Sequence, residues 1–287
     1  MLNYFQILLL AVIQGLCELL PVSSSAHVIA AEKLMGVDPS SPEMTMLLVM
    51  LHTGTMFAVI VYFWKRWMRD YFSSRGQLQW FCIQILIASA CTAVVYEVVK
   101  HAAVKIFLHD ASKAQVEDLF NNLPLIAGAL AAVGLLIIYS GLKEEKTPRE
   151  SEVQPRHSVI IGLVQGISLA LRGFSRSGST ISTGLLLGLP KQKLEEFSFA
   201  LAVVLTPAAI AQEAVRLLKQ NHDAVGGHLD LGHLFLPSLV GMVFSFLAGL
   251  LALKWLTRWL EAGRWIYFGC YCVVAAVGIM IIHYKVP

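Results

Sequence analysis

Six apolar runs constrain this chain more than any other feature, because each is about 20 residues long. At about 1.5 Å of rise per residue, such a run forms a helix that spans a bilayer's roughly 30 Å hydrocarbon core. The runs occupy residues 44–64, 78–99, 123–142, 196–219, 234–254 and 265–284. Only 14% of the residues are charged, against about 25% in soluble domains. The sequence therefore predicts an all-α polytopic membrane protein that lies in the lipid bilayer.

The net charge of +3 comes from basic residues that stand mainly between the apolar runs. A nucleic-acid-binding protein would instead concentrate basic residues on one face, so we expect no nucleic-acid partner. Basic residues mark the cytoplasmic loops of membrane proteins. They follow the first, third and fifth runs, which orients these three loops to the cytoplasm and both chain ends to the outside.

Two further apolar stretches, residues 4–36 and 158–190, are interrupted in the middle by polar segments. The interruptions read PVSSSAH and RGFSRSGST, so each stretch predicts a half-helix, a turn and a second half-helix. Non-helical backbone at membrane depth is tolerated only where protein or a water-filled cavity covers it. We therefore expect two re-entrant helical hairpins that converge on a polar site.

The chain also repeats itself. A shift of 151 residues superimposes residues 13–24 on 164–175, with glutamine, glycine, leucine and serine identities. The predicted organisation is a single membrane domain, residues 1–287, with repeat halves 1–142 and 158–287 joined by a polar linker at 143–157. Each half carries one re-entrant hairpin and three transmembrane helices. Because the loop charges make the hairpins enter from opposite faces, the halves form an inverted-topology repeat.

The first hairpin carries Gln14 and Glu18, which are four residues apart and share one helix face. They could present oxygens to a cation or a proton, or simply form a buried polar pair between helices. Ser24 and His27 follow the turn at Pro21. They have the residue types of a nucleophile and its base, although a helix-capping serine near an unrelated histidine has the same spacing.

The second hairpin concentrates one arginine, four hydroxyl groups and two glycines in residues 173–180. Backbone amides at a helix start, together with hydroxyls and a guanidinium, suit phosphate binding. The alternative is a turn in which serines cap the helix and Arg176 extends to the membrane surface. Arg176 lies deep in its segment, which favours the phosphate site.

At these two hairpins the sequence resembles the bacitracin-resistance family of bacterial undecaprenyl-diphosphatases (BacA/UppP). QGLCELLPVSSSAH is similar to the family's (E/Q)xxxE motif followed by PVSS-x-x-H, and GFSRSGST is similar to its PGxSRSxxT motif. The order of the motifs, their spacing and the pattern of spans extend the resemblance over the whole chain. One position departs from the motif, since Arg172 stands where the family has proline.

The resemblance implies hydrolysis of undecaprenyl diphosphate, a polyprenyl diphosphate lipid, at the bacterial inner (cell) membrane. This reaction recycles the lipid carrier for peptidoglycan and other envelope polymers, confers bacitracin resistance and depends on a divalent cation, Mg²⁺ or Ca²⁺. The resemblance also implies a homodimer. Carried over by position, its site residues are Gln14 and Glu18 for the metal, Glu18, Ser24, His27 and Arg176 for catalysis, and Gly173, Ser175, Ser177 and Thr180 for the substrate phosphate.

We expect Ser24 to attack and His27 to act as its base, with the site open to the outer, periplasmic face. Direct attack by His27 or by an activated water is the alternative. A secondary transporter or flippase of a phosphorylated lipid or anion is the rival function, because inverted repeats and broken helices are typical of transporters.

Overall fold

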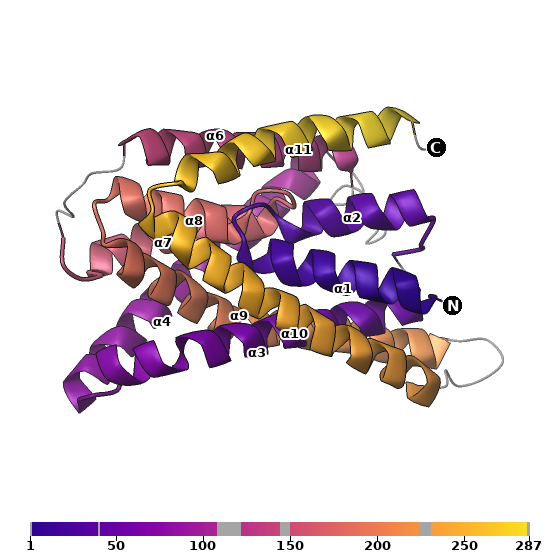
Figure 1. Cartoon of the computed structure of the whole chain (residues 1–287), viewed down its shortest axis with the longest axis horizontal. Helices are drawn as coiled ribbons and strands as arrows, with labels where there is room; N and C mark the ends of the chain where they lie inside the picture. The colour runs from indigo at the N-terminus through magenta and orange to yellow at the C-terminus, as the bar shows by residue number, and fades with distance from the viewer. Residues whose placement is uncertain (1, 40, 108–121, 144–149, 224–230, 286–287) are drawn as a thin grey trace.

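A computed structural model describes residues 2–39, 41–107, 122–143, 150–223 and 231–285, and their regular secondary structure is entirely helical (Figure 1). The helices, in chain order, are α1 (Tyr4–Leu19), α2 (Ser24–Met35), α3 (Pro42–Asp70), α4 (Arg75–Phe107), α6 (Leu123–Lys143), α7 (Pro155–Ala170), α8 (Arg176–Leu186), α9 (Lys191–Asp223), α10 (Leu231–Glu261) and α11 (Trp265–Lys285). The predicted helical class is confirmed. Residues 144–149 of the predicted linker lie outside the described residues.

Six of these helices are long and apolar enough to cross a membrane. They are α3, α4, α6, α9, α10 and α11, and each contains one of the six predicted runs. The prediction of a polytopic membrane protein is therefore confirmed by the number, length and apolar composition of these helices.

The four remaining helices are shorter and form two consecutive pairs, α1 with α2 and α7 with α8. With 16 residues each, α1 and α7 extend about 24 Å, less than the hydrocarbon core. Each second helix begins at a serine cap: Ser23 accepts from the Ala26 amide, and Ser175 accepts from the Gly178 amide. The predicted break in each stretch is thus a turn whose polar side chains satisfy helix-end amides.

The main helix contacts join α6 with α11, α3 with α10 and α9, α4 with α7, and α1 with α10 (Figure 1). Small residues allow several of these close approaches. A Cβ atom on Gly15 of α1 would lie 2.6 Å from the Ser245 carbonyl oxygen of α10. A Cβ atom on Gly166 of α7 would lie 2.7 Å from the Thr92 carbonyl oxygen of α4. Backbone contact at small residues is typical of helix packing in membranes.

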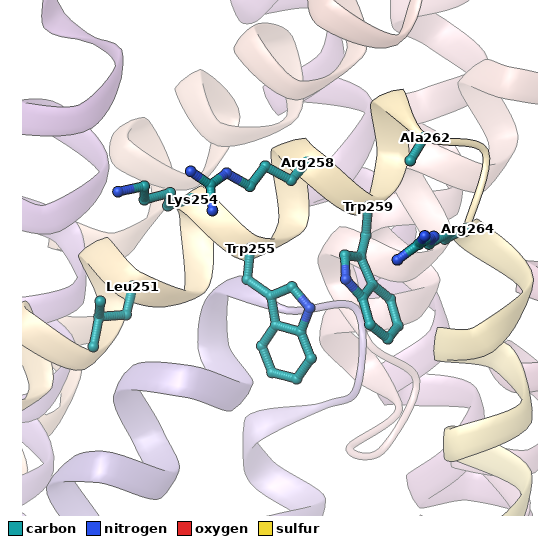
Figure 2. A pocket seen from close by; sticks show the side chains of 7 residues that line it. All are labelled: Leu251, Lys254, Trp255, Arg258, Trp259, Ala262 and Arg264. Atoms are coloured by element: carbon teal, nitrogen blue, oxygen red, sulfur yellow. The ribbon is translucent and has the colours of Figure 1, made fainter.

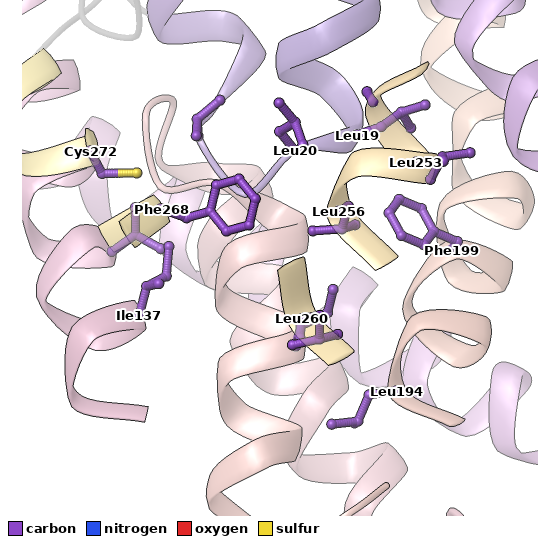
Figure 3. Packing of buried hydrophobic residues seen from close by; sticks show 14 of the residues in the cluster. Leu19, Leu20, Ile137, Leu194, Phe199, Leu253, Leu256, Leu260, Phe268 and Cys272 are labelled. Carbon is purple, nitrogen blue, oxygen red and sulfur yellow. The ribbon is translucent and has the colours of Figure 1, made fainter. Parts of the chain in front are cut away.

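Buried apolar side chains surround the two turns (Figure 3). Leu20 comes from the first turn, Phe199 from α9, Leu256 from α10 and Phe268 from α11, and all belong to one cluster. Since a packed core resists deformation, this cluster supports the polar turns from several directions.

Candidate active site

The two turns meet at the centre of the molecule (Figure 1). The Gly173 amide donates to Ser25 Oγ over 3.3 Å, and Ser177 Oγ donates to the Leu20 carbonyl oxygen over 3.2 Å. These bonds satisfy backbone groups that the turns leave without helical partners. The two motifs, which are far apart in the sequence, therefore form a single polar centre.

Glu18, near the end of α1, accepts hydrogen bonds from two other residues of the first motif. Its Oε2 atom accepts a hydrogen bond of 2.6 Å from Ser24 Oγ at the start of α2. The same oxygen accepts from Gln14 Nε2 over 3.2 Å, one helical turn earlier. The chain can bring Ser24 back to Glu18 because α1 ends at Leu19 and the turn reverses its direction. The arrangement aims a carboxylate at a hydroxyl, as general-base activation requires.

Arg176, the first residue of α8, brings the second motif to the same carboxylate. Its Nη2 atom lies 3.4 Å from Glu18 Oε1, and its Nη1 atom donates to the Ser198 carbonyl oxygen over 3.4 Å. The arginine side chain is only 12% exposed. The guanidinium is thus held inside the protein by α1 and α9, and it does not extend to the membrane surface.

The second turn requires a glycine. Gly173 has φ +97°, a conformation that side chains disfavour, and a Cβ atom there would lie 2.4 Å from the Ile126 carbonyl oxygen. The predicted phosphate-binding hydroxyls are already engaged within the protein. Ser175 caps α8, Ser177 bonds Leu20, and Thr180 Oγ1 donates to the Arg176 carbonyl oxygen over 2.8 Å. Arg176 and the N-terminal amides of α8 therefore remain the strongest anion-binding groups here.

His27 lies one turn beyond Ser24 but faces a different helix. Its Nδ1 atom lies 2.8 Å from the Ser23 carbonyl oxygen, so Nδ1–H donates there and leaves Nε2 as an acceptor. Tyr271 of α11 donates its hydroxyl to Nε2 over 2.8 Å. The expected pairing of Ser24 with His27 is not what the structure has, because α2 turns Ser24 toward α1 and His27 toward α11.

Three neighbours of the predicted residues had no signal in the sequence. Ser198 and Phe199 belong to α9: the Ser198 hydroxyl lies 2.7 Å from Thr180 Oγ1, and the Phe199 ring centroid lies 6.0 Å from the Arg176 guanidinium carbon. Tyr271 lies inside an apolar run. No local motif marks these residues, since only helix packing brings them to the turns.

A small cavity of about 10 Å³ adjoins Glu18 and Arg176. Thr55 of α3 and Thr206 of α9 complete its polar lining. This volume holds about one water molecule. A larger anion at Arg176 must therefore separate the Glu18–Arg176 contact or enter between the turns.

The side chains around Glu18 offer too few oxygen ligands to hold a metal ion alone. They suit a metal ion whose remaining ligands come from waters and a bound substrate. Within the described ranges, no group of three or more histidine, cysteine, aspartate or glutamate side chains is arranged to hold a metal. Gln14 and Glu18 offer one amide oxygen and one carboxylate. Mg²⁺ commonly binds through one or two carboxylates, with waters and substrate phosphates as the other ligands, so these residues fit that mode of binding.

The fold and the site together define a helical membrane protein with a carboxylate–serine pair beside a buried arginine. Comparison with known families identifies the match: the model of bacitracin resistance protein BacA matches residues 7–278. The chain therefore belongs to the BacA family.

Individual relatives agree with this membership. The chain is 56% identical over 275 residues to undecaprenyl-diphosphatase 2 of Acinetobacter baylyi, covering 94% of this chain and 95% of the relative. It is 32% identical over 281 residues to undecaprenyl-diphosphatase of Bacteroides fragilis, with 96% of both chains covered. It is 30% identical over 278 residues to undecaprenyl-diphosphatase of Halothermothrix orenii, covering 97% of this chain and 96% of that one.

Proposed function

We propose that this protein hydrolyses undecaprenyl diphosphate to undecaprenyl phosphate and inorganic phosphate. The reaction recycles the lipid carrier for peptidoglycan and envelope polymers and so confers bacitracin resistance. The observation that carries the proposal is the convergence of Ser24 and Arg176 on the two oxygens of Glu18. This convergence supports the proposal because a hydroxyl and a guanidinium contact the same carboxylate. The similarity to relatives named as diphosphatases supports it as well.

The geometry supports Ser24 as the nucleophile and revises its base. Glu18 takes the Ser24 proton while Oγ forms a bond to the terminal phosphorus and the bond to the bridging oxygen breaks. Undecaprenyl phosphate leaves and receives the proton. Water then attacks the phosphorus of the phosphoserine while Glu18 accepts a proton from it. The Ser24 Oγ–phosphorus bond breaks, Glu18 returns that proton to Ser24 Oγ, and inorganic phosphate departs. The 2.6 Å contact between Ser24 and Glu18 is within the range that such proton transfer needs.

Arg176 has the role of holding the terminal phosphoryl group. Its guanidinium can form two parallel hydrogen bonds to phosphate oxygens, and the α8 N-terminus adds a favourable dipole. Charge that develops on these oxygens in the transition state is stabilised more strongly than in water, because the site is buried. The arginine must leave Glu18 to do so, which frees the carboxylate to act as the base.

His27 has the role of an orienting group. Its bonds to Ser23 and Tyr271 anchor the first turn of α2, which carries Ser24. Gln14 and Glu18 would hold the divalent cation, Mg²⁺ or Ca²⁺, which supplies charge neutralisation for the diphosphate when bound. One carboxylate suffices for this because the substrate itself provides further oxygen ligands.

The finer architecture belongs to the same proposal: one membrane domain made of inverted repeats with two re-entrant hairpins. Contacts between the halves support it, since α1 packs on α10 as α7 packs on α4.

With the basic loops inside, α1 and α2 enter the inner (cell) membrane from the periplasm, and the site opens to that face. The long isoprenoid tail then stays in lipid. The homodimer implied by the resemblance also remains a prediction.

The test is phosphate release from undecaprenyl diphosphate by the purified protein in detergent. We expect release by the wild type and its loss in the double variant Glu18→Ala/Arg176→Ala. Activity that survives in the double variant would contradict the site, and absence of release from every polyprenyl diphosphate would contradict the function. Uptake of substrate into liposomes without hydrolysis would favour the rival transporter, which the similarity to diphosphatases does not support.

A further inference from the structure

A second polar feature lies outside the candidate active site, where α10 turns into α11. Here an open pocket of about 520 Å³ is lined by three cationic residues, Lys254, Arg258 and Arg264, and by two indole rings, Trp255 and Trp259 (Figure 2). The pocket shares no residue with the candidate active site. The proposed hydrolysis of the diphosphate therefore gives no role to this pocket.

The cationic groups of this pocket are not neutralised by the protein. Lys254 and Arg258 are four residues apart on one helix face, and their charged ends extend to the same side of α10 (Figure 2). In the part of the chain that the structure describes, neither forms an ion pair, and neither does Arg264. Like charges at this spacing repel each other, so an anion between them would relieve the repulsion.

The aromatic wall is fixed before any ligand arrives. Trp255 and Trp259 meet edge to face with their ring centroids 5.2 Å apart. Trp259 also packs against Phe268 of α11 at 5.2 Å, and Phe268 is buried in the core. Because Trp255 keeps 43% of its surface exposed, the wall offers a rigid apolar face to an incoming molecule.

The depth of the pocket along α10 indicates which class of molecule it suits. The apolar run of α10 ends at Lys254, and the exposed Leu251 lies one turn nearer its middle. The pocket thus lies where hydrocarbon gives way to head groups, the depth that tryptophan prefers in membranes. Basic pockets between membrane helices on the cytoplasmic side bind the head groups of anionic lipids.

We propose that this pocket binds the phosphate head group of an anionic membrane phospholipid. The phosphate lies between Lys254 and Arg258, and Arg264 lines the other end of the pocket beside Trp259 (Figure 2). An acyl chain descends along Trp255 and Leu251. With the basic loops inside, the lipid belongs to the cytoplasmic leaflet, the opposite face from the proposed active site. The proposal goes beyond the hydrolytic function and does not depend on it.

The test uses the full-length protein in detergent micelles and counts retained lipids by native mass spectrometry, with phosphatidylglycerol and phosphatidylcholine as probes. We expect phosphatidylglycerol to bind preferentially to the wild type. The double variant Lys254→Ala/Arg258→Ala should bind it roughly thirtyfold more weakly. The exchanged variant Lys254→Arg/Arg258→Lys should retain binding, because both charges persist.

A matched control is Lys65→Ala/Arg75→Ala, which removes two exposed cations at helix ends on the same predicted face but outside the pocket. We expect this variant to bind phosphatidylglycerol as the wild type does. Equal losses in the two alanine double variants would overturn the proposal in favour of general surface charge. Equal binding of both lipids by the wild type would overturn it as well.

Discussion

Ser24 Oγ donates a hydrogen bond of 2.6 Å to Glu18 Oε2, across the turn that separates α1 from α2. The carboxylate is therefore the group in direct contact with the hydroxyl, whereas the His27 imidazole bonds Ser23 and Tyr271. This relationship distinguishes a serine activated by glutamate from one activated by histidine, and the two mechanisms predict different variants to be inactive.

Removing the hydroxyl or the carboxylate should abolish most of the activity. We expect Ser24→Ala and Glu18→Gln each to reduce kcat about 100- to 10,000-fold, because nucleophile and base act in the same step. Phosphate release in detergent measures the effect, with Ser73→Ala in the exposed turn between α3 and α4 as a control of normal activity. Rapid quenching of the wild type should trap phosphate on Ser24. Phosphohistidine at position 27 would contradict this mechanism.

Arg176→Lys should keep the positive charge and still lose much of the rate. Lysine cannot form the two parallel bonds of a guanidinium, so we expect kcat to fall about 100-fold. The exposed Arg156 at the start of α7 provides a matched Arg156→Lys control with normal turnover. Wild-type turnover by Arg176→Lys would show that the arginine supplies charge alone.

Tyr271→Phe should reveal whether catalysis depends on the hydrogen bond from the Tyr271 hydroxyl to His27. The variant keeps the ring, which stacks on His27 with centroids 5.6 Å apart, and removes only the hydroxyl. We expect kcat to fall about fivefold, the effect of one neutral hydrogen bond. Tyr267→Phe is the control, since that tyrosine is 60% exposed and contacts Trp259 through its ring alone. Identical kinetics for both variants would remove Tyr271 from the site.

Gly15→Ala should destabilise the fold through backbone overlap. The new Cβ atom would lie 2.6 Å from the Ser245 carbonyl oxygen, and separating α1 from α10 costs about 1–3 kcal/mol. Gly128→Ala in α6 is the control, because a Cβ atom there meets nothing within 4 Å. Thermal unfolding in detergent should show a lower Tm for the first variant only. Equal Tm values would mean that α1 and α10 can separate to admit the methyl group without a measurable loss of stability.

Cysteine labelling tests the proposed orientation. A cysteine at Ser151, in the linker, should resist a membrane-impermeant maleimide in intact cells, whereas a cysteine replacing the exposed Pro39, between α2 and α3, should react. The wild type provides the background, since its cysteines lie within apolar helices. Reaction at Ser151 alone would reverse the orientation and move the site opening to the cytoplasm.

The helical membrane class, the six spans and the two broken stretches could all be predicted from the sequence. These features follow from local chemistry: an apolar run must satisfy its backbone within a helix, and proline, glycine and serine end that helix where they occur. The spacing of Gln14 and Glu18 likewise puts both on one face, as found. Resemblance to a family added the motifs and their expected chemistry.

Which side chains meet at the site depends on how the helices pack against one another. Arg176 reaches Glu18 because the two turns dock on each other, and His27 meets Tyr271 because α11 packs beside α2. Ser24 and His27 are close in sequence, yet the turn directs their side chains to different helices. Periodicity describes the faces of one helix but not its rotation against a neighbour. That rotation is set by the close packing of many side chains at once, such as Gly15 against Ser245.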